Sequence, residues 1–297
     1  NLDNLTIEKK IGEFSEKGLR VLALAYKEID NKQFKIEDLR GLTFVGLTGI
    51  QDAVRDEVKE AIDECTMAGV KVVMITGDHV QTAKAVGKEV GIAKAKGAPD
   101  ALRGVDLESM SDDELFRKVQ DIDVFARVAP DHKYRIVEQL QKHGNIVAMT
   151  GDGVNDAPAL RKADIGIAMG AGSDVAKEAA HMVLIDNNFT SIVGAIRRGR
   201  VILTNLQHIL LYILATSFGG ILTITTSVLM GFPLPVLPAQ LLWINLVTDG
   251  TSTFPLAFEK EHGNPMRSLP RRKDAPLITR SMVFRIVFAG LLMMIGT

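Results

Sequence analysis

Short apolar runs alternate with amphipathic stretches of helical period over the first 190 residues. The apolar runs predict strands at residues 42–47, 70–75, 124–125, 146–149, 165–169 and 182–185. The amphipathic stretches predict helices at residues 54–68, 81–90, 112–119, 131–142, 157–162 and 174–179. Strands that are apolar on both faces need cover on both faces, which alternating helices supply. The pattern therefore predicts an α/β domain with a parallel sheet between layers of helices.

A different pattern begins near residue 190. Residues 192–230 predict one long helix, and between Val201 and Phe258 the only formally charged side chain is Asp249. This helix exceeds the roughly 20 residues that cross a bilayer. A proline-rich break at 231–238 precedes a second predicted span at 239–258, and a third, at 282–297, is expected to be truncated. The sequence thus predicts α-helical transmembrane segments after the α/β domain.

Basic residues near the predicted spans indicate their orientation. Arg197, Arg198 and Arg200 precede the uncharged part of the first span, and four basic residues follow the second within 267–273. By the positive-inside rule, both flanks lie in the cytoplasm and the proline-rich turn lies outside. We therefore expect a multi-pass integral membrane protein, in contact with membrane lipid, whose α/β domain is cytoplasmic.

Composition adds two constraints. The formal net charge is −1, and no basic stripe with interleaved aromatics is present, so a nucleic-acid partner is not expected. The single cysteine, Cys65, cannot form an intramolecular disulfide, which favours a reducing compartment for the soluble part.

The same polar turn follows two of the predicted strands. Thr76-Gly77-Asp78 follows one, and Thr150-Gly151-Asp152 follows another and continues as Gly153-Val154-Asn155-Asp156. Glycines at the carboxyl end of a strand let the backbone approach a phosphate, and carboxylates beside a phosphate fit Mg²⁺. Arg127 and Lys133, between the two turns, supply positive charge for a transferring phosphoryl group. One such turn alone is usually a structural device, but this combination favours phosphate chemistry.

These motifs resemble the later motifs of the haloacid-dehalogenase-like (Rossmann-like) fold as it occurs in P-type cation-transporting ATPases. The resemblance extends through Phe125-Ala126-Arg127-Val128-Ala129-Pro130 and Trp243-Ile244-Asn245-Leu246-Val247-Thr248-Asp249-Gly250, and is nearest to the calcium-pump-like type II branch. It implies the tail of a nucleotide-binding domain at 1–40, a phosphorylation domain at 41–190, and stalk and transmembrane helices at 191–297.

For the phosphate site, the resemblance implies specific roles. Asp152 would bind the catalytic Mg²⁺, with Asn155 and Asp156 supporting the phosphate and the metal. Thr76-Gly77 would contact the phosphoryl group, and Lys133 would neutralise it. Lys133 and Asn155 would also help to bind ATP.

The resemblance also implies positions near the nucleotide and at a hinge. Asp78 and Arg127 would lie close to ATP, and Asp52 and Arg55 would form the hinge to the nucleotide-binding domain. Relatives usually carry proline after this aspartate, whereas this chain has Ala53, which weakens the hinge assignment.

Two features of the family are absent from the sequence. The Asp-Lys-Thr-Gly-Thr loop, which carries the phosphorylated aspartate, does not occur, and most of the nucleotide-binding domain is not represented. Lys96-Gly97-Ala98-Pro99 imitates a motif of that domain but lies after Thr76-Gly77-Asp78, so we interpret it as coincidental. The expected partners are therefore an actuator domain, a nucleotide-binding domain and further transmembrane helices, and this chain alone should not turn over ATP.

A carboxylate within the second predicted span is the other candidate site. Placing Asp249 there costs at least about 2.5 kcal/mol on insertion scales. Asn245 and Thr248 lie on the same helix, and in calcium-pump relatives the equivalent residues bind the transported cation. Where those pumps carry an asparagine and a glutamate in the preceding helix, this chain has Ser217 and Gly220. One transported ion per cycle is thus expected, with calcium, another divalent cation or a monovalent cation as candidates.

Three functions follow from these patterns. The first is ATP-driven cation transport through an aspartyl phosphate. The second is a membrane-anchored phosphatase of the haloacid-dehalogenase type, against which the intramembrane carboxylate argues. The third is a regulatory fragment without chemistry, which the missing phosphorylated aspartate would fit.

Overall fold

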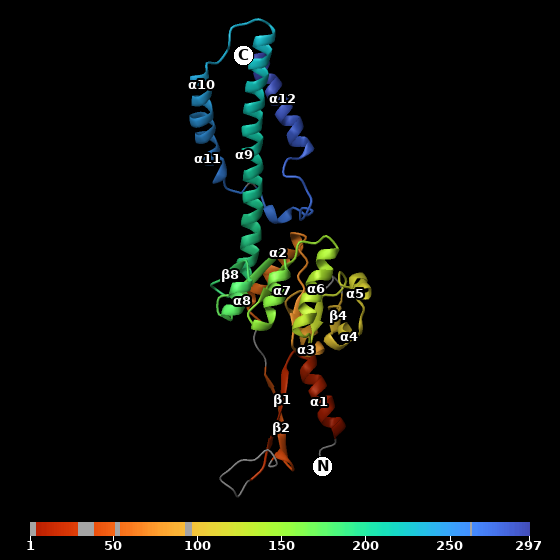
Figure 1. Ribbon diagram of the computed structural model, residues 1–297. Helices are drawn as coiled ribbons and strands as arrows, with labels where there is room; N and C mark the ends of the chain where they lie inside the picture. The colour runs from red at the N-terminus through yellow and green to blue at the C-terminus, as the bar shows by residue number, and fades with distance from the viewer. Residues whose placement is uncertain (1–3, 29–38, 51–53, 93–96, 262) are drawn as a thin grey trace. The chain divides into compact units, whose positions relative to one another are not determined.

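The computed structural model describes residues 4–28, 39–50, 54–92, 97–261 and 263–297 (Figure 1). The chain divides into two compact units, Asn1–Ser191 and Ile192–Thr297. Each unit has its own internal packing and is described by itself.

The parallel strands of the first unit form two three-stranded sheets, with strand orders β3-β5-β4 and β6-β7-β8. The strands are β3 (Met74–Thr76), β4 (Ala101–Arg103), β5 (Val124–Ala126), β6 (Ala148–Gly151), β7 (Ile165–Met169) and β8 (Met182–Leu184). The predicted α/β class with parallel strands is confirmed. Among the described strands, β3 and β6 are each the last strand of their sheet, and each leads into a Thr-Gly-Asp turn.

The strand predicted at residues 42–47 does not join a parallel sheet. It forms β2 (Thr43–Ile50), which pairs antiparallel with β1 (Arg20–Tyr26). Several of its residues are exposed, so it is not the doubly covered strand that its apolar run suggested. The hairpin crosses residue 40, the boundary predicted from the sequence, and that domain division stays a prediction.

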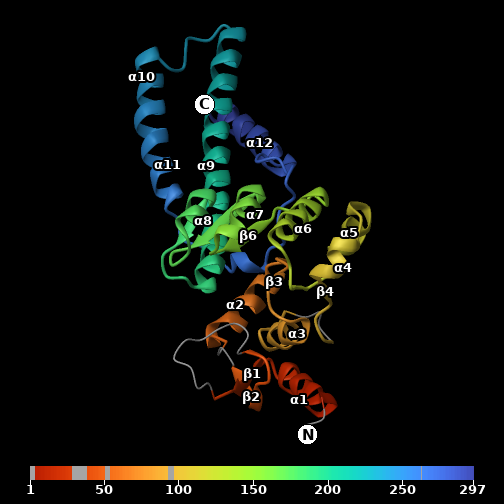
Figure 2. The ribbon, with the colours of Figure 1, turned by 60° about the horizontal axis from the view of Figure 1, so that its bottom comes forward.

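Helices separate the parallel strands, as the periodicity predicted. Those between parallel strands are α3 (Val80–Glu89), α4 (Gly104–Ser109), α5 (Asp112–Lys118), α6 (Pro130–Lys142), α7 (Ala157–Lys162) and α8 (Asp174–Ala179). α1 (Asn4–Glu16) and α2 (Asp56–Met67) precede β3. Local caps fix several starts: Ser111 and Glu114 form a reciprocal capping box at α5, and the Ser173 hydroxyl accepts from the Ala176 N–H at α8. The short β4 and α4 were not predicted. Helix α3 packs on β3, β4 and β5. Figure 2 shows α3 beside β3 and β4.

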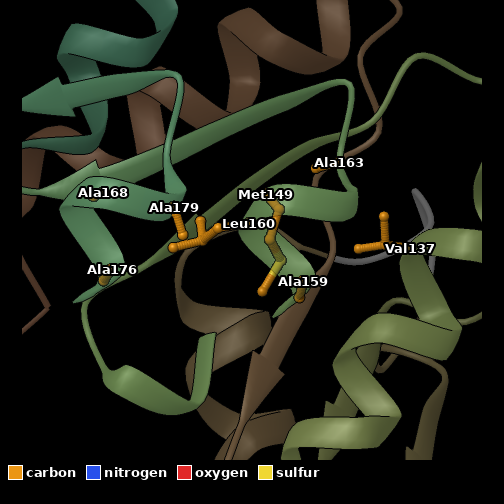
Figure 3. Close-up of a cluster of buried hydrophobic side chains, with 8 residues drawn as sticks. All are labelled: Val137, Met149, Ala159, Leu160, Ala163, Ala168, Ala176 and Ala179. Atoms are coloured by element: carbon orange, nitrogen blue, oxygen red, sulfur yellow. The ribbon is translucent and has the colours of Figure 1, made fainter. Parts of the chain in front are cut away.

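The core around β6 and β7 consists mainly of small and branched side chains. Its buried members are Val137, Met149, Ala159, Leu160, Ala163, Ala168, Ala176 and Ala179 (Figure 3). The many alanines let α7 and α8 approach the sheet closely. Ile75 of β3 packs against this cluster and also against the cluster around Phe125, so the two sheets share packing within the unit.

Leu160 offers a test of this core. Its side chain is fully buried among alanines that cannot fill the space it would leave. We expect Leu160→Ala to cost about 2–5 kcal/mol and to lower the thermal unfolding midpoint of the first unit. Leu39→Ala, at a leucine 54% exposed, is the matched control and should leave the midpoint unchanged. Equal midpoints for both variants would contradict this core.

The second unit is helical. It contains most of α9 (Phe189–Leu229), then α10 (Pro238–Trp243), a π-helical segment (Ile244–Asp249), α11 (Gly250–Ala257) and α12 (Arg280–Gly296). Of the described helices, α9 alone is long and apolar enough to cross a membrane. The predicted second span is helical from residue 239 to residue 257 but consists of three pieces. α12, at the third predicted span, has 17 residues.

Side chains of α9 hold the connection between α11 and α12. The buried Asn205 donates its Nδ2 to the carbonyls of Ala257 (3.3 Å) and Glu259 (2.9 Å). Arg200 donates its Nη1 to the carbonyls of Pro265 (3.0 Å) and Ser268 (2.7 Å). These bonds tie the end of α11 to α9.

Candidate functional site

The first Thr-Gly-Asp turn lies at the carboxyl end of β3. The Thr76 hydroxyl donates to Asp78 Oδ2 (2.9 Å) and accepts from the Asp78 N–H (3.1 Å). Gly77 and Asp78 are exposed. The Val128 N–H donates to the Thr76 carbonyl (3.4 Å), which places Arg127 next to this turn. Thr76, Gly77, Asp78 and Arg127 therefore gather at one sheet edge, where parallel sheets bind ligands.

The second turn is organised around one buried carboxylate. Asp156 is 5% exposed, and its Oδ2 accepts the N–H groups of Asp152 and Gly153, both at 3.1 Å. Its Oδ1 receives Lys133 Nζ at 2.5 Å from α6. A buried carboxylate is costly unless it is paired and hydrogen-bonded, and Asp156 is both. A Cβ on Gly151 would lie 2.5 Å from the Asp156 Cβ, so glycine is required at that position.

Asp152 and Asn155 stand on the outside of the same turn. Both are exposed, and within the described residues the Asp152 carboxylate makes no hydrogen bond or ion pair. No group of three or more His, Cys, Asp or Glu side chains in the described part of the chain could hold a metal ion unaided. Mg²⁺ is usually held by one or two carboxylates with phosphate oxygens and waters, so Asp152 fits that mode.

Lys133 and Arg55 both have protein partners in the structure. Lys133, expected to neutralise a phosphoryl group, donates its Nζ to the buried Asp156 carboxylate, and its role toward phosphate stays a prediction. Arg55 precedes α2 and donates its Nη1 to the Asn187 carbonyl (3.1 Å), whereas Asp52 and Ala53 lie outside the described residues. The hinge role of Asp52 and Arg55 stays a prediction.

The second candidate site lies on the π-helical segment. Asn245, Thr248 and Asp249 all belong to it, and Asn245 and Thr248 are exposed. Asp249 is half-buried, and its Oδ1 is buried without a hydrogen-bond partner among the described residues. A carboxylate oxygen in that position is expensive without a partner, and a cation would supply one. π-helical turns occur frequently at functional sites.

On α9, the two positions at which calcium pumps carry an asparagine and a glutamate hold small residues, Ser217 and Gly220. Ser217 is exposed, and a Cβ on Gly220 would meet nothing within 4 Å. A larger side chain therefore fits at residue 220 in this unit. The arrangement offers one carboxylate, Asp249, where a two-ion site would need more charge.

Two family models match this chain. Residues 7–164 match the haloacid dehalogenase-like hydrolase model, and residues 233–297 match the model of the cation transporting ATPase C-terminus. The first match contains both Thr-Gly-Asp turns, and the second contains Asn245, Thr248 and Asp249.

Curated relatives align along nearly the whole chain. A calcium-transporting ATPase of Bacillus subtilis is 43% identical over 293 residues, covering 98% of this chain and 33% of the relative. A cation-transporting ATPase, pma1, of Synechocystis is 45% identical over 295 residues, covering 98% of this chain and 32% of the relative. The chain thus spans about a third of the length of these relatives.

A solved structure is also similar. The crystal structure of a zinc-transporting PIB-type ATPase in the E2.Pi state matches with a TM-score of 0.56 and 26% identity, covering 86% of this chain and 33% of that one.

Proposed function

Because the chain belongs to the haloacid dehalogenase-like hydrolases, in their cation-transporting P-type ATPase branch, we propose that it serves ATP-driven transport of Ca²⁺ or another divalent cation. The phosphoryl group would pass from ATP to an aspartate outside this sequence. The Oδ1 of Asp249, which has no hydrogen-bond partner among the described residues, carries the proposal, since the membrane anchor of a phosphatase needs no carboxylate.

In this proposal the residues after β6 prepare the phosphate site. Asp156 fixes the turn by accepting two backbone N–H groups, and this leaves Asp152 exposed to hold Mg²⁺. When bound, Mg²⁺ neutralises charge on phosphoryl oxygens. Lys133, at 2.5 Å from Asp156, is close enough to exchange this partner for a phosphate oxygen. Thr76 and Gly77 would donate to the same group.

β3 and β6 are edge strands, and each could pair with a strand from the rest of a pump. β3 and β6 each end their sheet and lead into a Thr-Gly-Asp turn. An edge strand presents unpaired N–H and C=O groups that another strand can use. We propose that a strand carrying the phosphorylated aspartate pairs there, with the actuator domain, the nucleotide-binding domain and other membrane helices completing the protein.

Helix α9 is the proposed link between chemistry and transport. It runs for 41 residues without a break, about 60 Å, from the first unit through the second. Because Asn205 holds the end of α11, a shift of α9 would reach the helix that follows Asp249. With Arg197, Arg198 and Arg200 on the cytoplasmic flank, the first unit would be cytoplasmic and residues 231–238 external.

Transport in sealed inside-out vesicles tests the function. For the complete protein, we expect uptake of Ca²⁺ that requires both ATP and Mg²⁺. Mn²⁺, Mg²⁺ and K⁺ offered in place of Ca²⁺ identify the ion, and the monovalent alternative predicts uptake of K⁺ instead. Hydrolysis of phosphate esters that no cation stimulates, without uptake, would favour the membrane-anchored phosphatase.

A further inference from the structure

A small cavity of about 140 Å³ lies at the carboxyl ends of β3, β5 and β4. It is lined by His79, Val80, Arg103, Gly104, Val105, Ala126 and Arg127. Arg103 ends β4, Arg127 follows β5, and His79 caps the start of the ten-residue α3. Of these lining residues, only Arg127 was assigned above to the phosphate site at the first Thr-Gly-Asp turn.

The polar part of this lining is basic. Of the described residues that line the cavity, none is acidic, and Arg103 and Arg127 each carry a fixed positive charge. The start of α3 adds N–H groups and the positive end of a helix dipole. Arg103 donates its Nε and Nη2 to the two oxygens of Asp106, both at 2.8 Å, and these hydrogen bonds lower the pKa of Asp106. This bidentate contact uses two of the three guanidinium nitrogens, so Nη1 remains for a ligand.

The backbone that carries the two arginines is tightly constrained. A Cβ on Gly104 would lie 2.1 Å from the Arg127 carbonyl oxygen, so only glycine allows the start of α4 to pass that close to Arg127. Arg127 itself has a φ of 51°, a conformation that is uncommon outside glycine and clusters at functional sites. The Val128 N–H bond to the Thr76 carbonyl then sets the cavity beside the first Thr-Gly-Asp turn.

We propose that Arg103, together with Arg127 and the start of α3, binds a phosphate group of the nucleotide. The cavity is smaller than the roughly 300–1,000 Å³ of sites that enclose a whole ligand, so it suits one anionic group of a larger molecule. Arginine suits phosphate because it stays charged and its N–H groups donate to phosphate oxygens, and Arg103 offers Nη1 beside its contact with Asp106. This inference rests on the proposed function, since it assumes that the complete protein uses ATP.

The test compares two routes to the phosphoenzyme in the complete protein. Arg103→Ala should raise the ATP concentration for half-maximal phosphorylation about tenfold, which corresponds to about 1.4 kcal/mol of binding. Phosphorylation by inorganic phosphate without nucleotide should keep its half-maximal concentration within about twofold. The second route also separates a nucleotide phosphate from free phosphate, because a free-phosphate site would shift both responses.

Asp106→Asn is the matched control, since it breaks the ion pair and keeps the arginine. Its ATP response should stay within about twofold of the unaltered protein. An unchanged ATP response in Arg103→Ala, an equal shift in both routes, or the same shift in Asp106→Asn would overturn the inference. Absence of phosphoenzyme by either route in the unaltered protein would instead overturn the proposed function.

Discussion

Replacing Asp152 with asparagine is expected to abolish Mg²⁺-dependent phosphoenzyme formation in the complete protein, by at least about 100-fold. The carboxylate is exposed and makes no hydrogen bond or ion pair among the described residues, so the fold has little need of its charge. Asparagine keeps the size and one oxygen but removes the negative charge that a hard cation prefers. The loss should therefore be chemical, with unchanged thermal stability and normal membrane insertion.

Two further variants sharpen this expectation. Asp174→Asn makes the same substitution at a carboxylate that is 96% exposed, and should keep wild-type phosphorylation. Asp156→Asn should behave differently from Asp152→Asn, because it leaves the Lys133 ammonium without its carboxylate partner and disturbs the bonds to the turn. We expect it to lose stability as well as activity. Phosphoenzyme at wild-type level and Mg²⁺ affinity in Asp152→Asn would contradict the assignment of the metal ligand.

At the phosphate site, the sequence patterns identify the candidate residues but not their contacts. Thr76, Asp152 and Asp156 could be selected because polar residues followed apolar strands, and Lys133 because it supplies positive charge between the two turns. Their contacts could not be predicted. That Asp156 turns inward to bind Lys133 and two N–H groups, while Asp152 stays outside, depends on the close approach permitted by Gly151.

Short elements escaped the sequence analysis for a different reason. β4 has three residues and α4 has six, too few to show a period, so Arg103 gave no signal as a neighbour of Arg127. β2 was recognised as a strand but given the wrong partner. An apolar run indicates burial or pairing but does not identify the neighbouring strand, and here that neighbour, β1, lies earlier in the chain.

The irregular helix around Asp249 has local causes that can be identified in retrospect. The Thr251 and Thr253 hydroxyls donate to the carbonyls of Val247 and Asp249, four residues earlier, a contact that often bends helices. Pro255 has no N–H to donate within α11. These residues are visible in the sequence, but they do not indicate that a π-helical turn would contain all three predicted ligands.

The last expectation concerns Asp249 and the transported ion. If a cation is the missing partner of its Oδ1, cation binding should control phosphorylation by ATP. Asp249→Asn in the complete protein should then remove cation-activated phosphorylation by ATP. Phosphorylation by inorganic phosphate in the absence of the transported cation should survive, because that reaction would not depend on a cation bound at Asp249. A variant that merely misfolds would lose both reactions, so the asymmetry distinguishes a ligand from a structural residue.

Gly220→Glu is the companion variant, because a Cβ at Gly220 meets nothing within 4 Å and a second carboxylate has room there. Its added charge should offset a further divalent ion, raising the number of ions bound per phosphorylation site above that of the unaltered protein. Asp249→Asn tests the opposite change, the loss of the one carboxylate present. If that variant keeps a normal cation dependence, Asp249 is a packed or protonated helix residue, and the cation must bind elsewhere.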